Sequence, residues 1–229
     1  LGIAIHGGKA YVADSVNRRI QRYTTAGASE LAWGSLGTGN GQFDLPTGVA
    51  VGQDGTVYVA DRWNDRIQVF DSNGGFIRAI GANGSLPGQF NRPRGVALDS
   101  SGALYVSDTG NNRIQKLSAS GSHLASWGGP GSGPGELMSP EGITIDAAGD
   151  VYVSEAVNYR IQKFDSSGAF ITKWGVQGPG DGEFRGPTGL AIDPVGNIYV
   201  ADIDRIQKFA CITPGPTATV TPTLTPTPV

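Results

Sequence analysis

A four-residue pattern returns along this chain at a constant spacing of 47 residues. It reads Tyr-Val-Ala-Asp or a close variant, and its tyrosines are Tyr11, Tyr58, Tyr105, Tyr152 and Tyr199. A fixed period of this size indicates a repeat architecture, in which each unit buries its apolar face against the next unit. The repeat therefore constrains the fold of the 229 residues more than any other feature of the sequence.

Each repeat unit is predicted to hold four short strands. In the second unit, β-rich runs fall at 48–51, 57–60, 66–70 and 76–80, with turn residues between them. A spacing of about 12 residues per strand and turn is typical of an all-β array. The 36 glycines suit many turns with positive φ, and no 3.6-residue apolar stripe predicts a helix. The sequence thus predicts an all-β propeller with four-stranded antiparallel blades.

Three motifs recur in order at constant offset. They are Pro-x-Gly followed by three apolar or small residues, Tyr-Val-[Ala/Ser]-Asp, and Asn-x-Arg-Ile-Gln. Together they resemble the NHL-repeat family of β-propellers, of the bacterial secreted or surface type, over residues 2 to about 210. The resemblance implies a propeller that usually has six blades, and it does not fix an activity.

The predicted ring is incomplete. The fourth, outer strand is expected around Trp33, Ile80, Trp127 and Trp174, and the fifth unit has no counterpart before the Pro/Thr-rich end. We therefore expect the fifth blade to lack its outer strand. Because an uncovered β-edge invites aggregation, we expect one more blade or partial blade before Leu1, giving six blades in the native ring.

The propeller is expected to span residues 1–212, and residues 213–229 form a separate segment in which Thr and Pro alternate. Such a segment cannot bury apolar surface, so it predicts an extended linker or tail. It resembles the Thr-Pro linkers of bacterial cell-surface proteins, and the alternative is a terminus without function. The linker interpretation predicts an extracellular or cell-surface location, and a monomeric propeller within a larger multidomain chain.

An acidic residue and an arginine recur in every unit. The pairs are Asp14 and Arg19, Asp61 and Arg66, Asp108 and Arg113, Glu155 and Arg160, and Asp202 and Arg205. A ring of catalytic carboxylates is one interpretation, but a catalytic site needs asymmetry and every unit has the pair. We favour a structural ion pair within each blade that holds the loop between the second and third strands. No catalytic residue is predicted.

Metal and nucleophile motifs are weak. The two histidines, His6 and His123, fall at different points of the repeat, so a three-histidine zinc site cannot form from these residues. No Gly-x-Ser-x-Gly elbow is present. The tryptophans of the outer strand are interpreted as packing between blades. The sequence therefore predicts no metal site, no cofactor and no enzyme.

Recognition is predicted on the face of the disc where the loops vary from unit to unit, because loops on a rigid scaffold tolerate change. The candidate ligand-binding residues are Arg18, Arg62, Trp63, Asp65, Arg92, Arg94, Asn112, Glu141 and Tyr159. Four of them are expected to form a basic patch with one aromatic near the second and third blades, namely Arg62, Trp63, Arg92 and Arg94. Such a patch suits a binding hot spot, and the alternative is a solvated rim of mixed charge.

The predicted function is a non-catalytic binding, scaffold or sensor module that recognises a protein, peptide or glycan partner. A metal-dependent propeller lyase or lactonase is one alternative, and an RNA-binding NHL propeller is another. The net charge of −3 argues against a general nucleic-acid binder, which is usually basic. No stretch approaches the ~20 apolar residues of a membrane span, so no membrane insertion is expected.

Overall fold

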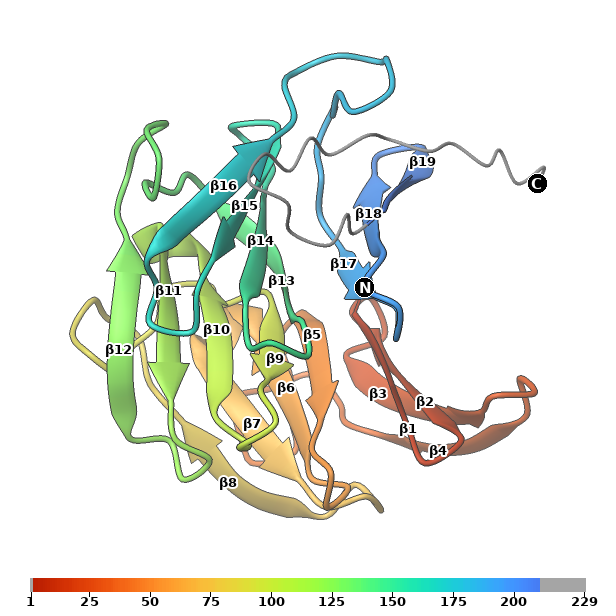
Figure 1. The fold of residues 1–229 in the computed structure, drawn as a ribbon. Coiled ribbons are helices and arrows are strands. Elements are labelled where there is room, and N and C mark those ends of the chain that lie inside the picture. Colours follow the sequence, from red (N-terminus) through yellow and green to blue (C-terminus); the bar gives the residue numbers. More distant parts are fainter. Residues whose placement is uncertain (1, 211–229) are drawn as a thin grey trace.

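The computed structural model describes residues 2–210, which form five antiparallel sheets set around a common centre (Figure 1). Each sheet corresponds to one 47-residue repeat. Within the described residues, the helical segments are two short 3-10 turns, η1 (Arg62–Asn64) and η2 (Thr109–Asn111). The predicted all-β propeller is confirmed.

The strand bounds follow the repeat. The first blade holds β1 (Ile3–His6), β2 (Lys9–Asp14), β3 (Arg19–Thr24) and β4 (Ser29–Trp33). The second holds β5 (Pro46–Val51), β6 (Val57–Asp61), β7 (Arg66–Phe70) and β8 (Phe76–Ile80). The third holds β9 (Val96–Leu98), β10 (Leu104–Asp108), β11 (Arg113–Leu117) and β12 (His123–Gly128). The fourth holds β13 (Pro140–Ile145), β14 (Val151–Glu155), β15 (Arg160–Phe164) and β16 (Phe170–Trp174). The fifth holds β17 (Leu190–Ile192), β18 (Ile198–Asp202) and β19 (Arg205–Phe209).

Within each blade the strands are hydrogen-bonded in chain order, from the innermost strand outward. The innermost strands neighbour one another around the centre, β1 beside β5, β5 beside β9, β9 beside β13 and β13 beside β17. The fifth sheet has three strands within residues 2–210, so the prediction that this blade lacks its outer strand is confirmed for the described chain.

In the second, third and fourth repeats, the glycine of the Pro-x-Gly motif stands where neighbouring innermost strands approach closely. A Cβ on Gly48 would lie 2.4 Å from the carbonyl oxygen of Arg94, and one on Gly95 would lie 2.4 Å from that of Glu141. A Cβ on Gly142 would lie 2.1 Å from the oxygen of Thr188. None of these contacts leaves room for a side chain, so the motif encodes the close approach of one blade to the next.

The core lies between blades. The Trp33 ring packs against Tyr11 of its own blade and Phe70 of the next, with ring centroids 6.5 and 5.9 Å apart. Trp127 and Trp174 repeat this arrangement in the third and fourth blades. Each tryptophan therefore joins two blades, and the predicted packing role of these side chains is confirmed.

Apolar side chains are exposed at the two ends of the arc of blades, formed by β1–β4 and β17–β19 in Figure 1. Ile206 is 68% exposed, whereas its counterparts one and two repeats earlier, Ile161 and Ile114, are fully buried. Ile3 is 65% exposed, whereas its counterpart Val49 is 6% exposed. A further blade would cover both surfaces, and the sixth blade stays a prediction.

The predicted domain boundary at residue 212 and the Thr/Pro segment 213–229 lie outside the described residues. The linker, the cell-surface location and the multidomain setting therefore stay predictions. Among residues 2–210, the structure contains no helix with the length and apolar character that a membrane crossing requires.

Aspartates hold the short turns on the face opposite the variable loops. Asp165 accepts hydrogen bonds from the hydroxyl and the backbone N–H of Ser167, at 2.6 and 2.8 Å, and from the Ala169 N–H at 2.9 Å. Gly168 completes this turn with a φ of 91°, a backbone conformation that residues with a side chain rarely adopt. These hydrogen bonds lower the pKa of Asp165 below its ordinary 3.8, with the largest contribution from the Ser167 hydroxyl and the next from the Ala169 N–H.

We expect the stabilisation from Asp165 to be complete above about pH 4 and to be lost as the pH falls through its lowered folded-state pKa. The gap in free energy of unfolding between the native chain and Asp165→Asn should stay constant from pH 5 to 7 and shrink below pH 4. Urea unfolding across this range measures it. Ser167→Ala, which removes the leading cause of the lowered pKa, should weaken the pH dependence, and parallel curves for Asp165→Asn and native chain would refute the assignment.

Candidate binding face

Antiparallel strands bring two loops of every blade to one face of the disc, the loop between its second and third strands and the loop that enters the next blade. The repeated acid and arginine are joined in each blade. The acid–arginine distances are 2.9, 2.9, 2.7, 2.5 and 3.5 Å from the first blade to the fifth. The loops of this face are therefore held by a repeated ionic framework.

This framework also reaches the loop that enters each blade from the previous one. The buried Asp61 carboxylate accepts hydrogen bonds from Arg66 Nε at 2.9 Å and Gln68 Nε2 at 3.0 Å. Arg66 also donates to the carbonyl oxygens of Gly39 and Gln42, at 2.7 and 3.0 Å. Sequence reasoning assigned the pair to its own loop alone. The structure adds the inter-blade loop, so the face is rigid across blade boundaries.

The residue before the repeated arginine has left-handed backbone geometry. Its φ is 52°, 52°, 54° and 53° at Arg18, Asp65, Asn112 and Tyr159. Two of these candidate residues hold the next loop with their side chains. Asp65 Oδ1 accepts the Arg92 N–H at 2.7 Å, and Asn112 Oδ1 accepts the Ser139 N–H at 2.8 Å. Their side chains therefore order the face from within.

The predicted basic patch gathers around Trp63. The guanidinium groups of Arg62 and Arg92 lie 5.0 and 4.8 Å from the centroid of the Trp63 ring. The turn η1 positions this ring. The backbone N–H of Trp63 donates to the Asp44 carbonyl oxygen at 3.0 Å, and the backbone N–H of Asp65 closes the turn by donating to the Arg62 carbonyl oxygen. Trp63 is 45% exposed, so the loop presents an aromatic ring flanked by two cations.

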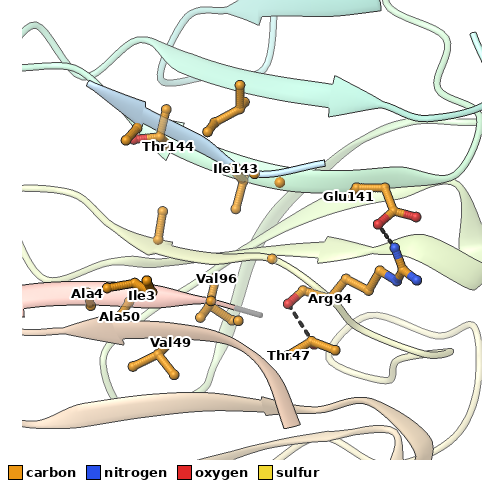
Figure 2. Close-up of a pocket in the computed structure, with 18 of the residues that line it drawn as sticks. Ile3, Ala4, Thr47, Val49, Ala50, Arg94, Val96, Glu141, Ile143 and Thr144 are labelled. Carbon is orange, nitrogen blue, oxygen red and sulfur yellow. Dashed lines mark hydrogen bonds and ion pairs between the residues drawn. The ribbon is translucent and has the colours of Figure 1, made fainter. Parts of the chain in front are cut away.

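The fourth member of the patch, Arg94, lies deeper, where the loop enters β9. Its guanidinium forms an ion pair with Glu141 of the next blade, and its carbonyl oxygen accepts a hydrogen bond from Thr47 Oγ1 at 3.0 Å (Figure 2). Burial, and then the nearby charge of Arg62, lower the pKa of Arg94 to about 10. Burial also lowers the pKa of Arg62, with a smaller contribution from the positive charge of Arg92. Arg94 stays protonated at neutral pH.

The remaining candidates lie on other loops. Arg18 Nε is 3.8 Å from Asp44, whose backbone oxygen holds Trp63, so Arg18 reaches the patch indirectly. Tyr159 lines a separate cavity of about 660 Å³ beside Trp174 in the fourth blade. The structure therefore joins Glu141, Asp65 and Arg18 to the four-residue patch and leaves Tyr159 apart.

The centre of the disc holds a cavity, which sequence reasoning considered only as the metal site of the lyase or lactonase alternative. Its volume is about 880 Å³, and the first strands of all five blades line it. The wall carries aliphatic side chains such as Val49, Val96 and Ile143, and Arg94 and Glu141 lie at one end (Figure 2). The middle residue of the Pro-x-Gly motif could have indicated which residues line this cavity, because a ring places equivalent positions of successive repeats around one centre.

Within residues 2–210, no group of three or more His, Cys, Asp or Glu side chains is placed to hold a metal ion. The predicted absence of a metal or cofactor stays a prediction.

Comparison with known proteins gives the family and the fold. The NHL repeat model matches residues 43–70, 90–117 and 137–164. No curated protein matches the sequence. Among solved structures, a virginiamycin B lyase from Staphylococcus aureus is similar with a TM-score of 0.69 and 18% identity, over 96% of this chain and 68% of that one. A chain of a nidogen/laminin complex is similar with a TM-score of 0.71 and 20% identity, over 92% and 75%. A protein of unknown function from Bacteroides caccae has a TM-score of 0.67 and 14% identity, over 91% and 77%. At these identities the likeness shows the fold.

Proposed function

From the premise that this chain is an NHL-repeat β-propeller, we propose that it is a non-catalytic recognition module. Its partner is a protein, peptide or glycan bound on the loop face, outside the cell or at its surface. The observation that carries the proposal is the exposed Trp63 ring between Arg62 and Arg92. Tryptophan and arginine are enriched in binding hot spots.

The rigidity of the loop face supports the proposal. The ionic framework holds each loop to two blades, as Arg66 does with Asp61 and Gly39. A partner that meets a preformed surface causes little loss of conformational freedom on binding. The shared fold with a chain of a nidogen/laminin complex is compatible with a protein partner. The same fold also occurs in a lyase, and fold alone does not decide between the two functions.

We expect the 229-residue protein to bind a subset of a peptide and glycan array, and Trp63→Ala to weaken those hits by about 2 kcal/mol, or roughly 30-fold in Kd. The ring supplies the apolar contact area at the centre of the patch. The matched control is Leu124→Ala, which truncates another exposed apolar side chain, 55% exposed on the outer strand β12. It should leave binding unchanged.

Other results would favour the alternatives. Stoichiometric metal in the purified protein together with no array hit would support a metal-dependent lyase or lactonase. Binding of RNA that weakens steeply with salt would support the RNA-binding alternative. Array hits that survive Trp63→Ala unchanged would place recognition elsewhere on the disc.

A further inference from the structure

We propose that the central cavity binds a carboxylate attached to an apolar group, with the carboxylate held by Arg62 and Arg94 at the cavity mouth. The inference rests on the proposed function in that it specifies ligand chemistry on the same face. It concerns the cavity beneath the patch, whereas the proposed hot spot is the exposed ring of Trp63.

The first observation is the charge of the cavity wall. Its ionisable side chains within the described residues are Arg62, Arg94 and Glu141, two positive and one negative. Glu141 pairs with Arg94, and Arg62 forms no ion pair with any residue of the described range 2–210. One cation at the mouth is therefore left without a counter-charge, and the surplus matches a single negative charge on a ligand.

The second observation is a pair of neighbouring guanidinium groups with few partners. Within residues 2–210, Arg62 forms no ion pair, and the Arg94 guanidinium pairs only with Glu141. The two guanidinium groups are near enough for the charge of Arg62 to lower the pKa of Arg94. A carboxylate between them would accept hydrogen bonds from their terminal Nη atoms and relieve their repulsion, since guanidinium and carboxylate match in geometry.

The third observation is the character of the wall behind the arginines. Val49, Val96 and Ile143 lie along it (Figure 2), but they are only 6–7% exposed because they pack between blades. The partly exposed aliphatic side chains of the wall are those of residues such as Leu98, Ile145 and Leu190. The volume of about 880 Å³ lies within the range of small-molecule sites. An apolar group bonded to the carboxylate would cover the exposed parts of these side chains, whereas a fully polar anion would not. The single surplus charge also favours a monoanion over a doubly charged phosphate.

Two sources share this chemistry, a free organic acid and the C-terminal carboxylate of a peptide that ends in an apolar residue. Both present one carboxylate next to an apolar body. Calorimetric titration of the 229-residue protein with octanoate and octanamide tests the shared chemistry. An acetylated tripeptide ending in leucine, with a free or an amidated C-terminus, distinguishes the sources.

We expect octanoate to bind at least 10-fold more tightly than octanamide. Arg62→Gln should weaken octanoate at least 10-fold and leave octanamide unchanged, and Arg62→Lys should have an intermediate effect because it keeps the charge and loses the planar fork. Glu141→Gln should strengthen octanoate, since it removes the competing carboxylate. Arg78→Gln is the matched control, because it removes one positive charge from the outer strand β8 and should change nothing.

Equal affinity for octanoate and octanamide, binding of neither, or an unchanged octanoate affinity in Arg62→Gln would overturn the inference. Thermal unfolding of each variant shows whether it is folded. If Arg62→Gln does not fold, the octanoate affinity of Arg62→Lys tests the role of Arg62 instead. Array hits that depend on Trp63 without octanoate binding would leave the proposed function standing and remove this inference. Octanoate binding without array hits would support this inference and count against the proposed function.

Discussion

Asp108→Asn is expected to lower the free energy of unfolding by about 3–5 kcal/mol, the range for breaking a buried ion pair by removing one partner. The Asp108 side chain is fully buried, and Arg113 Nε donates to it at 2.7 Å. It also accepts the Asn91 N–H at 2.8 Å and Gln115 Nε2 at 3.0 Å. The substitution leaves the arginine charge without its counter-charge and presents an amide N–H₂ where donors already converge.

The loss should extend beyond the third blade. Arg113 also donates to the carbonyl oxygens of Leu86 and Gln89, both at 3.0 Å, in the loop that enters from the second blade. Displacement of the arginine therefore frees that loop. Urea unfolding of Asp108→Asn, Arg113→Gln and the double variant measures the coupling between the two side chains.

The matched control is Asp14→Asn in the first blade. There the Asp14 and Arg19 side chains are 16% and 40% exposed, so water screens the pair, and its loss should cost about 1 kcal/mol or less. Equal losses for the two substitutions would contradict the account, because they would show that burial of the pair carries no weight.

Gly95→Ala is expected to lower the free energy of unfolding by about 3 kcal/mol, at the upper end of the range for overpacking. The added Cβ would lie 2.4 Å from the carbonyl oxygen of Glu141 and 3.0 Å from Ser107 Oγ. The oxygen belongs to the backbone of an inner strand, so it cannot rotate away as a side chain could. The third and fourth blades must separate, which disturbs the packing between them.

Gly189 supplies the control from the same position of the last repeat. A Cβ there would meet only the Ala201 Cβ, at 3.5 Å, which is an ordinary contact. In the 229-residue chain, Gly189→Ala should be neutral or stabilise by about 0.5 kcal/mol through the unfolded state. Thermal and urea unfolding of both variants tests the pair. A loss at Gly189 as large as that at Gly95 would show that the motif glycine serves backbone conformation instead of blade contact.

Much of the fold could be predicted from periodicity. Tyr-Val-x-Asp at a constant offset locates the second strand of each blade, and the missing outer-strand counterpart in the last repeat located the three-stranded sheet. The second role of Asp61 and Arg66 could not be predicted in this way. Their additional acceptors, Gly39 and Gln42, lie in a Gly-rich loop whose path depends on the packing of two blades.

The patch on the loop face could be predicted from the sequence, because Arg62 and Trp63 are adjacent and Arg92 lies in the loop that enters the next blade. The pairing of Arg94 with Glu141 was missed, although the two occupy the same position of successive repeats. Equivalent residues on innermost strands are neighbours in a ring, and that rule would have predicted the contact. The internal roles of Asp65 and Asn112 depend on left-handed backbone geometry, which the sequence pattern does not reveal for residues other than glycine.

The most direct test of recognition on the loop face is hydrogen exchange of the native chain with and without the tightest array hit. The account predicts slower exchange in residues 61–66 and 91–95, which carry the patch, and no change in the turns 52–56 and 71–75 on the opposite face. Slower exchange confined to those turns, with the patch unchanged, would contradict it.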